Sequence, residues 1–182
     1  MRNIIVSNYV TLDGFFEGPN REIDWFVWDD EVEQYGIDLL DRIDTILFGR
    51  VTYELMAGYW PTTTEENPAI TQAMNSLPKI VFSRTLDHVS WNNSRLVKGD
   101  LRDEVLKLKE GPGKDIVIYG SGSIVAALTN VGLIDEYQMM VNPVILGSGK
   151  PMFQGVEKPV KLKLIRSRPF DIGNVLLYYQ PE

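Results

Sequence analysis

The sequence predicts an α/β domain of three layers, in which helices flank a mixed, mostly parallel sheet. Apolar stretches of strand length alternate with segments of helical period, and strands joined through helices pair in parallel. The last two strands are joined by a short turn near Gly173, which predicts an antiparallel edge at the C-terminal end. The chain has 182 residues, about the length of one domain. We therefore expect a single domain over residues 1–182.

The first half of the chain is expected to hold two strands and two helices around a long aromatic loop. In residues 29–42, Val32, Tyr35 and Leu39 keep the helical spacing, and acidic residues fill the first turn. The loop over residues 10–28 contains Gly14 and several aromatic residues, and a long loop in a compact domain is usually functional. The expected strands are 3–9 and 45–48, and the expected helices are 29–42 and 51–59.

The second half begins with a clear helix signal. Asn67 followed by Pro68 is typical of an N-cap with proline at the first helical position. Asp100 is expected to cap a further helix. The expected helices are 67–77, 100–109 and 123–130, and the expected strands are 79–83, 115–119, 136–144, 160–166 and 174–180.

Composition argues against several classes of function. Lys and Arg number 18 against 25 Asp and Glu, a net charge of −7, so no basic field favours nucleic-acid binding. Cysteine is absent, which removes disulfides and thiolate chemistry and fits a cytoplasmic protein. The single histidine, His88, lies in a polar stretch, and no metal site is expected. Residues 116–134 carry no charge, but the glycines at 120 and 122 interrupt them, so no membrane span is predicted.

Three junctions between a strand and the following segment are candidates for binding, because ligands on such sheets lie at the carboxyl ends of strands. Gly49-Arg50-Val51-Thr52 leads into a helix whose N-terminus suits a phosphate. An ordinary turn with a solvated Arg50 fits that segment equally well. The second junction is 120–124, where Val125 replaces the last glycine of a dinucleotide fingerprint. The third is Ser83-Arg84, where a surface arginine is the simpler interpretation. Together, the three could line one groove for a dinucleotide.

These junctions carry a family resemblance. The segments 49–54, 79–84 and 117–123 resemble the dihydrofolate reductase superfamily in order and spacing. Leu12-Asp13-Gly14, the segment 132–137 and the segment 142–149 resemble the reductase domain of bifunctional riboflavin-biosynthesis enzymes. The resemblance covers nearly the whole chain. It implies a dihydrofolate reductase-like fold, NADPH as cofactor, and reduction of a pteridine-like or pyrimidine-like heterocycle.

The resemblance also implies roles for individual residues. The expected cofactor-binding residues are Gly49, Arg50, Thr52, Ser83, Arg84, Gly120, Ser121, Gly122, Ser123 and Ile124. The expected substrate-binding residues are Leu12, Gly14, Trp25 and Tyr53, and the expected catalytic acids are Asp13 and Glu33. Glu33 could instead be a solvated acid that stabilises the start of its helix. Trp25 could instead pack in the core.

Two departures from the riboflavin-type pattern count against a ribityl-phosphate substrate: Ser7 and Asn8 stand where a lysine is usual, and Tyr119 stands where an acid is usual. The alternatives are the 5-amino-6-(5-phosphoribosylamino)uracil reductase of riboflavin biosynthesis and a catalytically silent nucleotide-binding protein. The family implies a homodimer, for which Met139, Met140 and Val141 could supply apolar surface.

Overall fold

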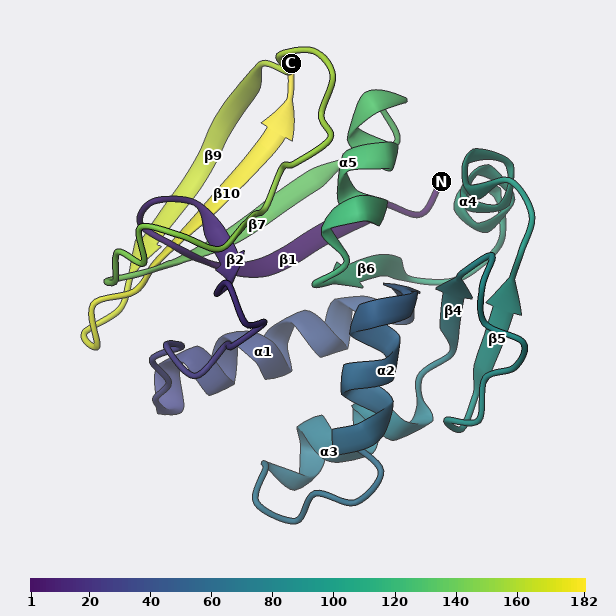
Figure 1. Ribbon diagram of the computed structural model, residues 1–182, viewed down its shortest axis with the longest axis horizontal. Coiled ribbons are helices and arrows are strands. Elements are labelled where there is room, and N and C mark those ends of the chain that lie inside the picture. Colours follow the sequence, from purple (N-terminus) through teal and green to yellow (C-terminus); the bar gives the residue numbers. More distant parts are fainter.

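The computed structural model describes residues 1–182 and is built on an eight-stranded sheet of order β5-β4-β3-β6-β1-β7-β10-β9 (Figure 1). The first six strands in this order pair in parallel, and β10 is antiparallel to both of its neighbours. The predicted mixed sheet with an antiparallel C-terminal edge is confirmed. Its strands are β1 (Ile4–Thr11), β3 (Ile43–Gly49), β4 (Lys79–Phe82), β5 (Ser94–Val97), β6 (Asp115–Tyr119), β7 (Glu136–Asn142), β9 (Leu162–Pro169) and β10 (Val175–Pro181).

Helices cover both faces of this sheet, which confirms the three layers. One face packs against α1, α2 and α3 through residues that include Val32, Tyr53 and Ile70. The other packs against α4 and α5 through residues that include Val105 and Leu128. The helices are α1 (Asp30–Arg42), α2 (Arg50–Tyr59), α3 (Pro68–Ser76), α4 (Leu101–Glu110) and α5 (Gly122–Asn130).

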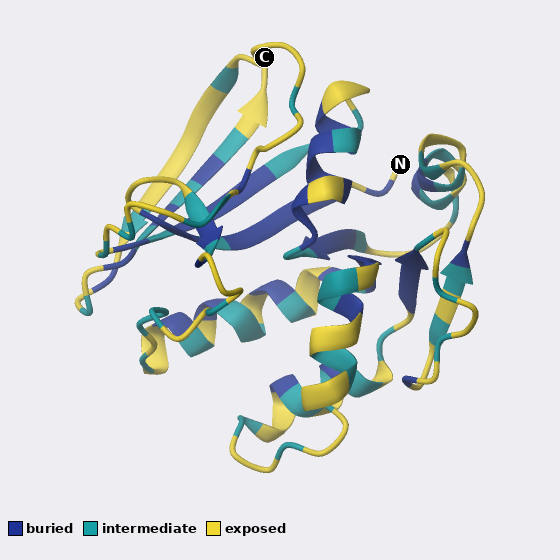
Figure 2. Cartoon of the chain, viewed as in Figure 1, coloured by how far each residue is buried: buried dark blue, intermediate teal, exposed yellow.

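The central strands are apolar on both faces because helices cover them on both sides. In β1, Ile4 and Val6 face the α4–α5 side and Ile5 faces the α1 side, and all three side chains are completely buried. Figure 2 shows this burial across the middle of the sheet, with exposed residues on the outer helix faces and along β9.

The structure differs from the sequence prediction at three unexpected strands, at the start of β9 and in the burial of two methionines. The loop over residues 10–28 contains a short strand, β2 (Phe15–Glu17), which pairs with an equally unexpected strand, β8 (Lys150–Pro151). β5 was not predicted, and β9 begins at Leu162 rather than at residue 160. Met139 and Met140 are buried inside the chain, with 7% and 1% exposure, because β7 is an interior strand. They therefore supply no apolar surface for a dimer.

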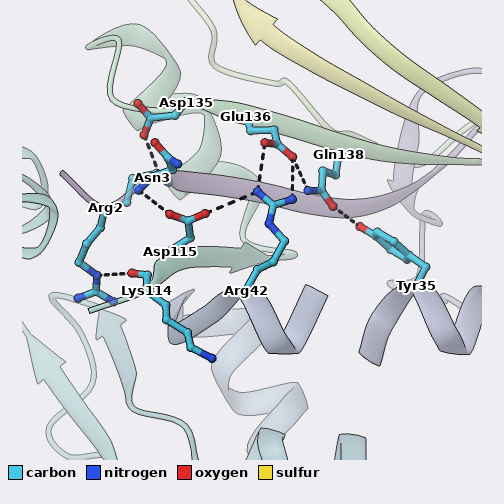
Figure 3. A network of polar contacts seen from close by, with 10 residues as sticks. Arg2, Asn3, Tyr35, Arg42, Lys114, Asp115, Asp135, Glu136 and Gln138 are labelled. Atoms are coloured by element: carbon cyan, nitrogen blue, oxygen red, sulfur yellow. Dashed lines mark hydrogen bonds and ion pairs between the residues drawn. The ribbon is translucent and has the colours of Figure 1, made fainter. Parts of the chain in front are cut away.

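The amino ends of the central strands are fastened by a polar network (Figure 3). Arg42 at the end of α1 reaches Glu136 at 3.4 Å and Asp115 at 3.5 Å. Asp115 in turn accepts a hydrogen bond from the backbone N–H of Asn3, and Asp135 accepts one from Ile4. These contacts link the amino ends of β1, β6 and β7 to one another and to the end of α1.

No helix is both long enough and apolar enough to cross a membrane. No group of three or more His, Asp or Glu side chains is arranged to hold a metal ion.

Candidate functional site

A cleft of about 220 Å³ lies at the carboxyl ends of β3, β4 and β6. These three strands are adjacent in the sheet, so the three junctions singled out in the sequence meet in one place, as predicted. The cleft is smaller than the ~300–1,000 Å³ typical of ligand pockets. Its lining comprises Phe16, Glu17, Gly49, Arg50, Val51, Thr52, Phe82, Ser83, Ser121, Gly122, Ser123, Ile124 and Lys150.

Two helix N-termini open into this cleft without a side-chain cap. Asp29, Asn67 and Asp100 accept hydrogen bonds from the first turns of α1, α3 and α4. By contrast, the N-cap residues of α2 and α5, Gly49 and Ser121, make no such bond. Free N–H groups and the positive end of the helix dipole favour an anion at both positions.

Side chains tie the two helix starts together. The Gly49 N–H donates to Ser121 Oγ at 2.9 Å, and the Ser121 N–H donates to Thr52 Oγ1 at 2.8 Å. Gly120 and Ser121 both have positive φ, 54° and 53°, and such consecutive left-handed residues are uncommon outside glycine. Thr52 and Ser121 thus hold the turn in shape and also line the cleft.

Asn8 of β1 fixes the same turn from the neighbouring strand. Its Nδ2 donates to Gly120 O at 3.0 Å, and its Oδ1 accepts from the Gly120 N–H at 2.5 Å. In the sequence, Asn8 stood out only as a departure from a family pattern. A side-chain amide can donate to and accept from the backbone of one turn. Because Asn8 and Gly120 are 112 residues apart, no pattern in the neighbouring sequence indicates this contact.

Two cations line the cleft, and each has an acidic partner at its rim. Arg50 Nη1 lies 2.9 Å from Glu54 Oε2, and Lys150 Nζ lies 3.6 Å from Glu17 Oε1. Lys150 also lies 5.3 Å from the centroid of the Phe16 ring. Sequence reasoning missed Lys150, because only the pairing of β2 with β8 brings it to the cleft. Ser83 lines the cleft as predicted, while Arg84 is exposed just beyond it.

Asp13 joins two loops. Its carboxylate accepts hydrogen bonds from Thr11 Oγ1, from the Leu146 N–H at 3.2 Å and from the Gly147 N–H at 2.7 Å. The Thr11 hydroxyl is the main cause that lowers the pKa of Asp13, with help from the two amides. A carboxylate held in its ionised form is a poor proton donor at neutral pH. Leu12 beside it is 66% exposed.

The remaining predicted residues lie away from the cleft. Glu33 accepts a hydrogen bond from Asn67 Nδ2 at 2.8 Å and so links α1 to the cap of α3. The Tyr53 ring is buried, and its hydroxyl accepts from the backbone N–H groups of Ser90 and Trp91. Trp25 packs edge-on against Phe26, with a centroid distance of 4.5 Å. In the structure Glu33, Tyr53 and Trp25 are engaged in contacts within the fold.

Comparisons with known proteins agree with this architecture. The uncharacterized protein YyaP of Bacillus subtilis (strain 168) is 39% identical over 180 residues, covering 98% of this chain and 94% of YyaP. A solved protein from Shewanella sp. PV-4 superposes with a TM-score of 0.81 at 24% identity, covering 100% and 99% of the two chains.

Two solved reductases have the same fold. The diaminohydroxyphosphoribosylaminopyrimidine deaminase/5-amino-6-(5-phosphoribosylamino)uracil reductase of Thermotoga maritima has a TM-score of 0.73 at 16% identity, covering 100% of this chain and 57% of that one. Dihydrofolate reductase from Enterococcus faecalis, solved with NADP(H), has a TM-score of 0.67 at 13% identity, covering 99% and 96%. The family model described as the RibD C-terminal domain matches residues 2–176. The chain therefore belongs to the RibD C-terminal domain family.

Proposed function

We propose that this protein is an NADPH-dependent reductase of a pteridine-like or pyrimidine-like heterocycle. The observation that carries the proposal is the convergence of two uncapped helix N-termini, those of α2 and α5, on one cleft. Two sets of free N–H groups at one cleft suit two linked phosphates, and a pyrophosphate is the centre of a nicotinamide dinucleotide. The fold shared with an NADP(H)-bound dihydrofolate reductase supports this choice of ligand.

The residues at the cleft fit such a cofactor. The backbone from Gly49 to Thr52 and from Gly120 to Ile124 would hold the pyrophosphate, and Arg50 and Lys150 would add positive charge. Ser83 and Arg84 would lie toward the 2′-phosphate, where an arginine makes charge-assisted hydrogen bonds. When bound, the cofactor supplies the hydride, and the chain's part is to bind and orient it.

The family and the shared fold also support the riboflavin-type alternative, reduction of 5-amino-6-(5-phosphoribosylamino)uracil. Ser7 and Asn8 count against it in this chain, because both are committed to internal contacts rather than to a substrate phosphate. Ser7 pairs with Tyr35, and Asn8 holds Gly120. A pteridine-like or base-only pyrimidine substrate is therefore our first proposal.

The experiment that tests this function has two parts. Calorimetric titration with NADPH is expected to show saturable binding at one site per chain. Absorbance of NADPH is then followed with a panel of dihydropterins and pyrimidinones, and at least one is expected to drive its oxidation. Tight NADPH binding with no turnover across the panel would support the silent nucleotide-binding alternative. Absence of NADPH binding would overturn both the proposed reductase and the riboflavin-type alternative.

A further inference from the structure

On the α1-facing side of the sheet, two tyrosines stand at the carboxyl ends of adjacent strands. Ser7 of β1 is paired with Tyr119 of β6, and Tyr9 lies two residues beyond Ser7 on the same face, because side chains alternate along a strand. Tyr9 and Tyr119 both pack at the edge of the core on that side. The two phenols are therefore diagonal neighbours, and Tyr119 directly precedes the Gly120 turn of the cleft.

The hydroxyls of these two tyrosines are unused by the fold. Neither has a hydrogen-bond partner in the chain, and the polar side-chain atoms fully sealed from solvent without a partner are Ser94 Oγ and Asn174 Oδ1. Tyr35 on the same face differs, since its hydroxyl bonds to Ser7 Oγ at 2.7 Å and to Gln138 Oε1 at 2.8 Å. Neither phenolic oxygen is among these sealed atoms, so both reach solvent and are open to a ligand.

An aromatic wall adjoins the pair. The Phe26 ring stacks on Tyr9 at a centroid distance of 4.8 Å and an interplanar angle of 24°. The Trp28 ring lies 5.7 Å from Tyr9, tilted by 32°, and Trp28 is 45% exposed. An exposed indole beside the Tyr9 phenol offers a flat ligand both a stacking surface and a hydrogen bond.

The pair is electrically neutral. Burial raises the pKa of both Tyr9 and Tyr119, and for Tyr9 the neighbouring Tyr119 raises it further. Both phenols therefore keep their protons throughout the physiological range and act as hydrogen-bond donors. No charged side chain contributes to either shift, so the two phenols meet a ligand as neutral hydrogen-bond donors.

We propose that Tyr9 and Tyr119 form the substrate-binding wall of this enzyme, which takes a flat, uncharged heterocycle beside Trp28 and donates two hydrogen bonds to its carbonyl or imine atoms. This inference rests on the proposed function, because Tyr119 leads into the cleft assigned to the cofactor. It narrows the substrate class to heterocycles that present acceptors, and it disfavours protonated, amino-rich rings.

The test is a titration of tryptophan fluorescence without cofactor, using 5,6-diaminouracil as the probe and 2,4,5,6-tetraaminopyrimidine as its counterpart with amino groups in place of carbonyls. Diaminouracil is expected to quench the fluorescence and to bind more tightly than tetraaminopyrimidine. Tyr9→Phe and Tyr119→Phe each remove only a hydroxyl and should weaken diaminouracil binding by about two- to tenfold, the effect of one neutral hydrogen bond.

Controls separate binding from folding. Tyr137→Phe removes a buried hydroxyl on the opposite face, where it bonds to Thr129, and should bind diaminouracil as the wild type does. Tyr9→Phe and Tyr119→Phe should keep the wild-type melting temperature, whereas Tyr35→Phe should lower it. The inference is overturned if diaminouracil does not bind, or if both variants bind it with wild-type affinity. NADPH titration of the same proteins keeps the two claims apart, since failure to bind NADPH counts against the proposed function alone.

Discussion

The side-chain amide of Asn8 forms two hydrogen bonds with the backbone of Gly120, 112 residues further along the chain. This contact connects the middle of β1 to the turn that starts α5. Ser121 in this turn has a left-handed backbone although it is not glycine, so the amide holds a conformation that the local sequence does not strongly favour. The cleft thus depends on a residue that does not line it.

Asn8→Ala is expected to lower stability by about 1–3 kcal/mol, because two hydrogen bonds are lost. It should also weaken NADPH binding, because the turn is then free to move. Urea denaturation and NADPH calorimetry measure the two effects. Asn130→Ala is the matched control, since the Asn130 amide likewise bonds two backbone groups, Gly155 O and the Glu157 N–H, at the far end of α5. Equal NADPH affinity in the two variants would refute a role for Asn8 in the cleft.

Gly120→Ala should damage the cleft through a steric clash. A Cβ at Gly120, whose φ is +54°, would lie 2.8 Å from Thr52. Gly132→Ala provides the control, because Gly132 has a φ of +67° but a Cβ there would meet nothing within 4 Å. Both variants are expected to lose about 1–2 kcal/mol from backbone strain, while only Gly120→Ala loses NADPH affinity. If calorimetry shows the same affinity for both, the close packing of Thr52 on this turn is unimportant for binding.

Arg84→Ala tests the preference for NADPH over NADH. A hydrogen bond to a charged group contributes roughly 1.5–3 kcal/mol, so NADPH binding should weaken by about ten- to a hundredfold. NADH, which lacks the 2′-phosphate, should bind almost unchanged. Arg102→Ala, an exposed arginine on α4, serves as a control for net charge. An equal loss of affinity for NADPH and NADH would show that Arg84 supports the fold or contacts the pyrophosphate that the two cofactors share.

Lys79 predicts a pH dependence of stability. Its side chain is fully buried, and Nζ donates to the backbone oxygens of Asn75, Leu77 and Asn92. Burial lowers the pKa of Lys79 from 10.5 to about 8. Between these two values the unfolded chain binds more protons than the folded one, so this residue makes stability rise with pH across that window.

Urea denaturation from pH 8 to 10 measures this contribution as the difference between the wild type and Lys79→Met. The difference should shift in favour of the wild type as pH increases. A difference that stays constant, or that shifts the other way, would show that the folded chain does not disfavour the charged lysine.

Asp13→Ala should release the loop that begins at Leu12 from the loop over residues 145–149. The Leu146 and Gly147 amides that donate to Asp13 should then exchange hydrogen faster. Asp13→Asn keeps one acceptor oxygen and should give an intermediate rate. Because the pKa of Asp13 is lowered in the folded chain, this contact is present at neutral pH and is lost as the pH falls through the lowered pKa. Unchanged exchange in Asp13→Ala would contradict the assigned role.

The sequence predicted those parts of the fold that local physics determines. Asn67 and Asp100 were predicted as caps because short polar side chains cap a first turn, and both do so. The helix over residues 29–42 was predicted from its apolar spacing, and the structure adds that Asp29 caps it. β5 was missed because Ser94 and Arg95 dilute its apolar pattern, and β8 was missed because it has only two residues.

The cleft was predicted in outline and not in detail. Glycine and serine at the ends of β3, β4 and β6 were sufficient to indicate it, because adjacent parallel strands end at one edge. Lys150 lines the cleft and Asn8 contacts the Gly120 turn only because distant strands pair in the folded chain. The residues next to them in the sequence do not indicate this pairing. Met139 and Met140 were assigned to a dimer surface that they do not form. An apolar strand pattern does not reveal whether the strand lies inside the sheet or at an interface.

The central claim is that the N-termini of α2 and α5 together hold the pyrophosphate of NADPH. The most direct measurement is calorimetric competition between NADPH and 2′-phospho-ADP-ribose, which carries the pyrophosphate but no nicotinamide. Both ligands are expected to bind at one site per chain, and saturation with the fragment is expected to abolish NADPH binding. If NADPH binds while the fragment neither binds nor competes, the pyrophosphate is not held where α2 and α5 begin.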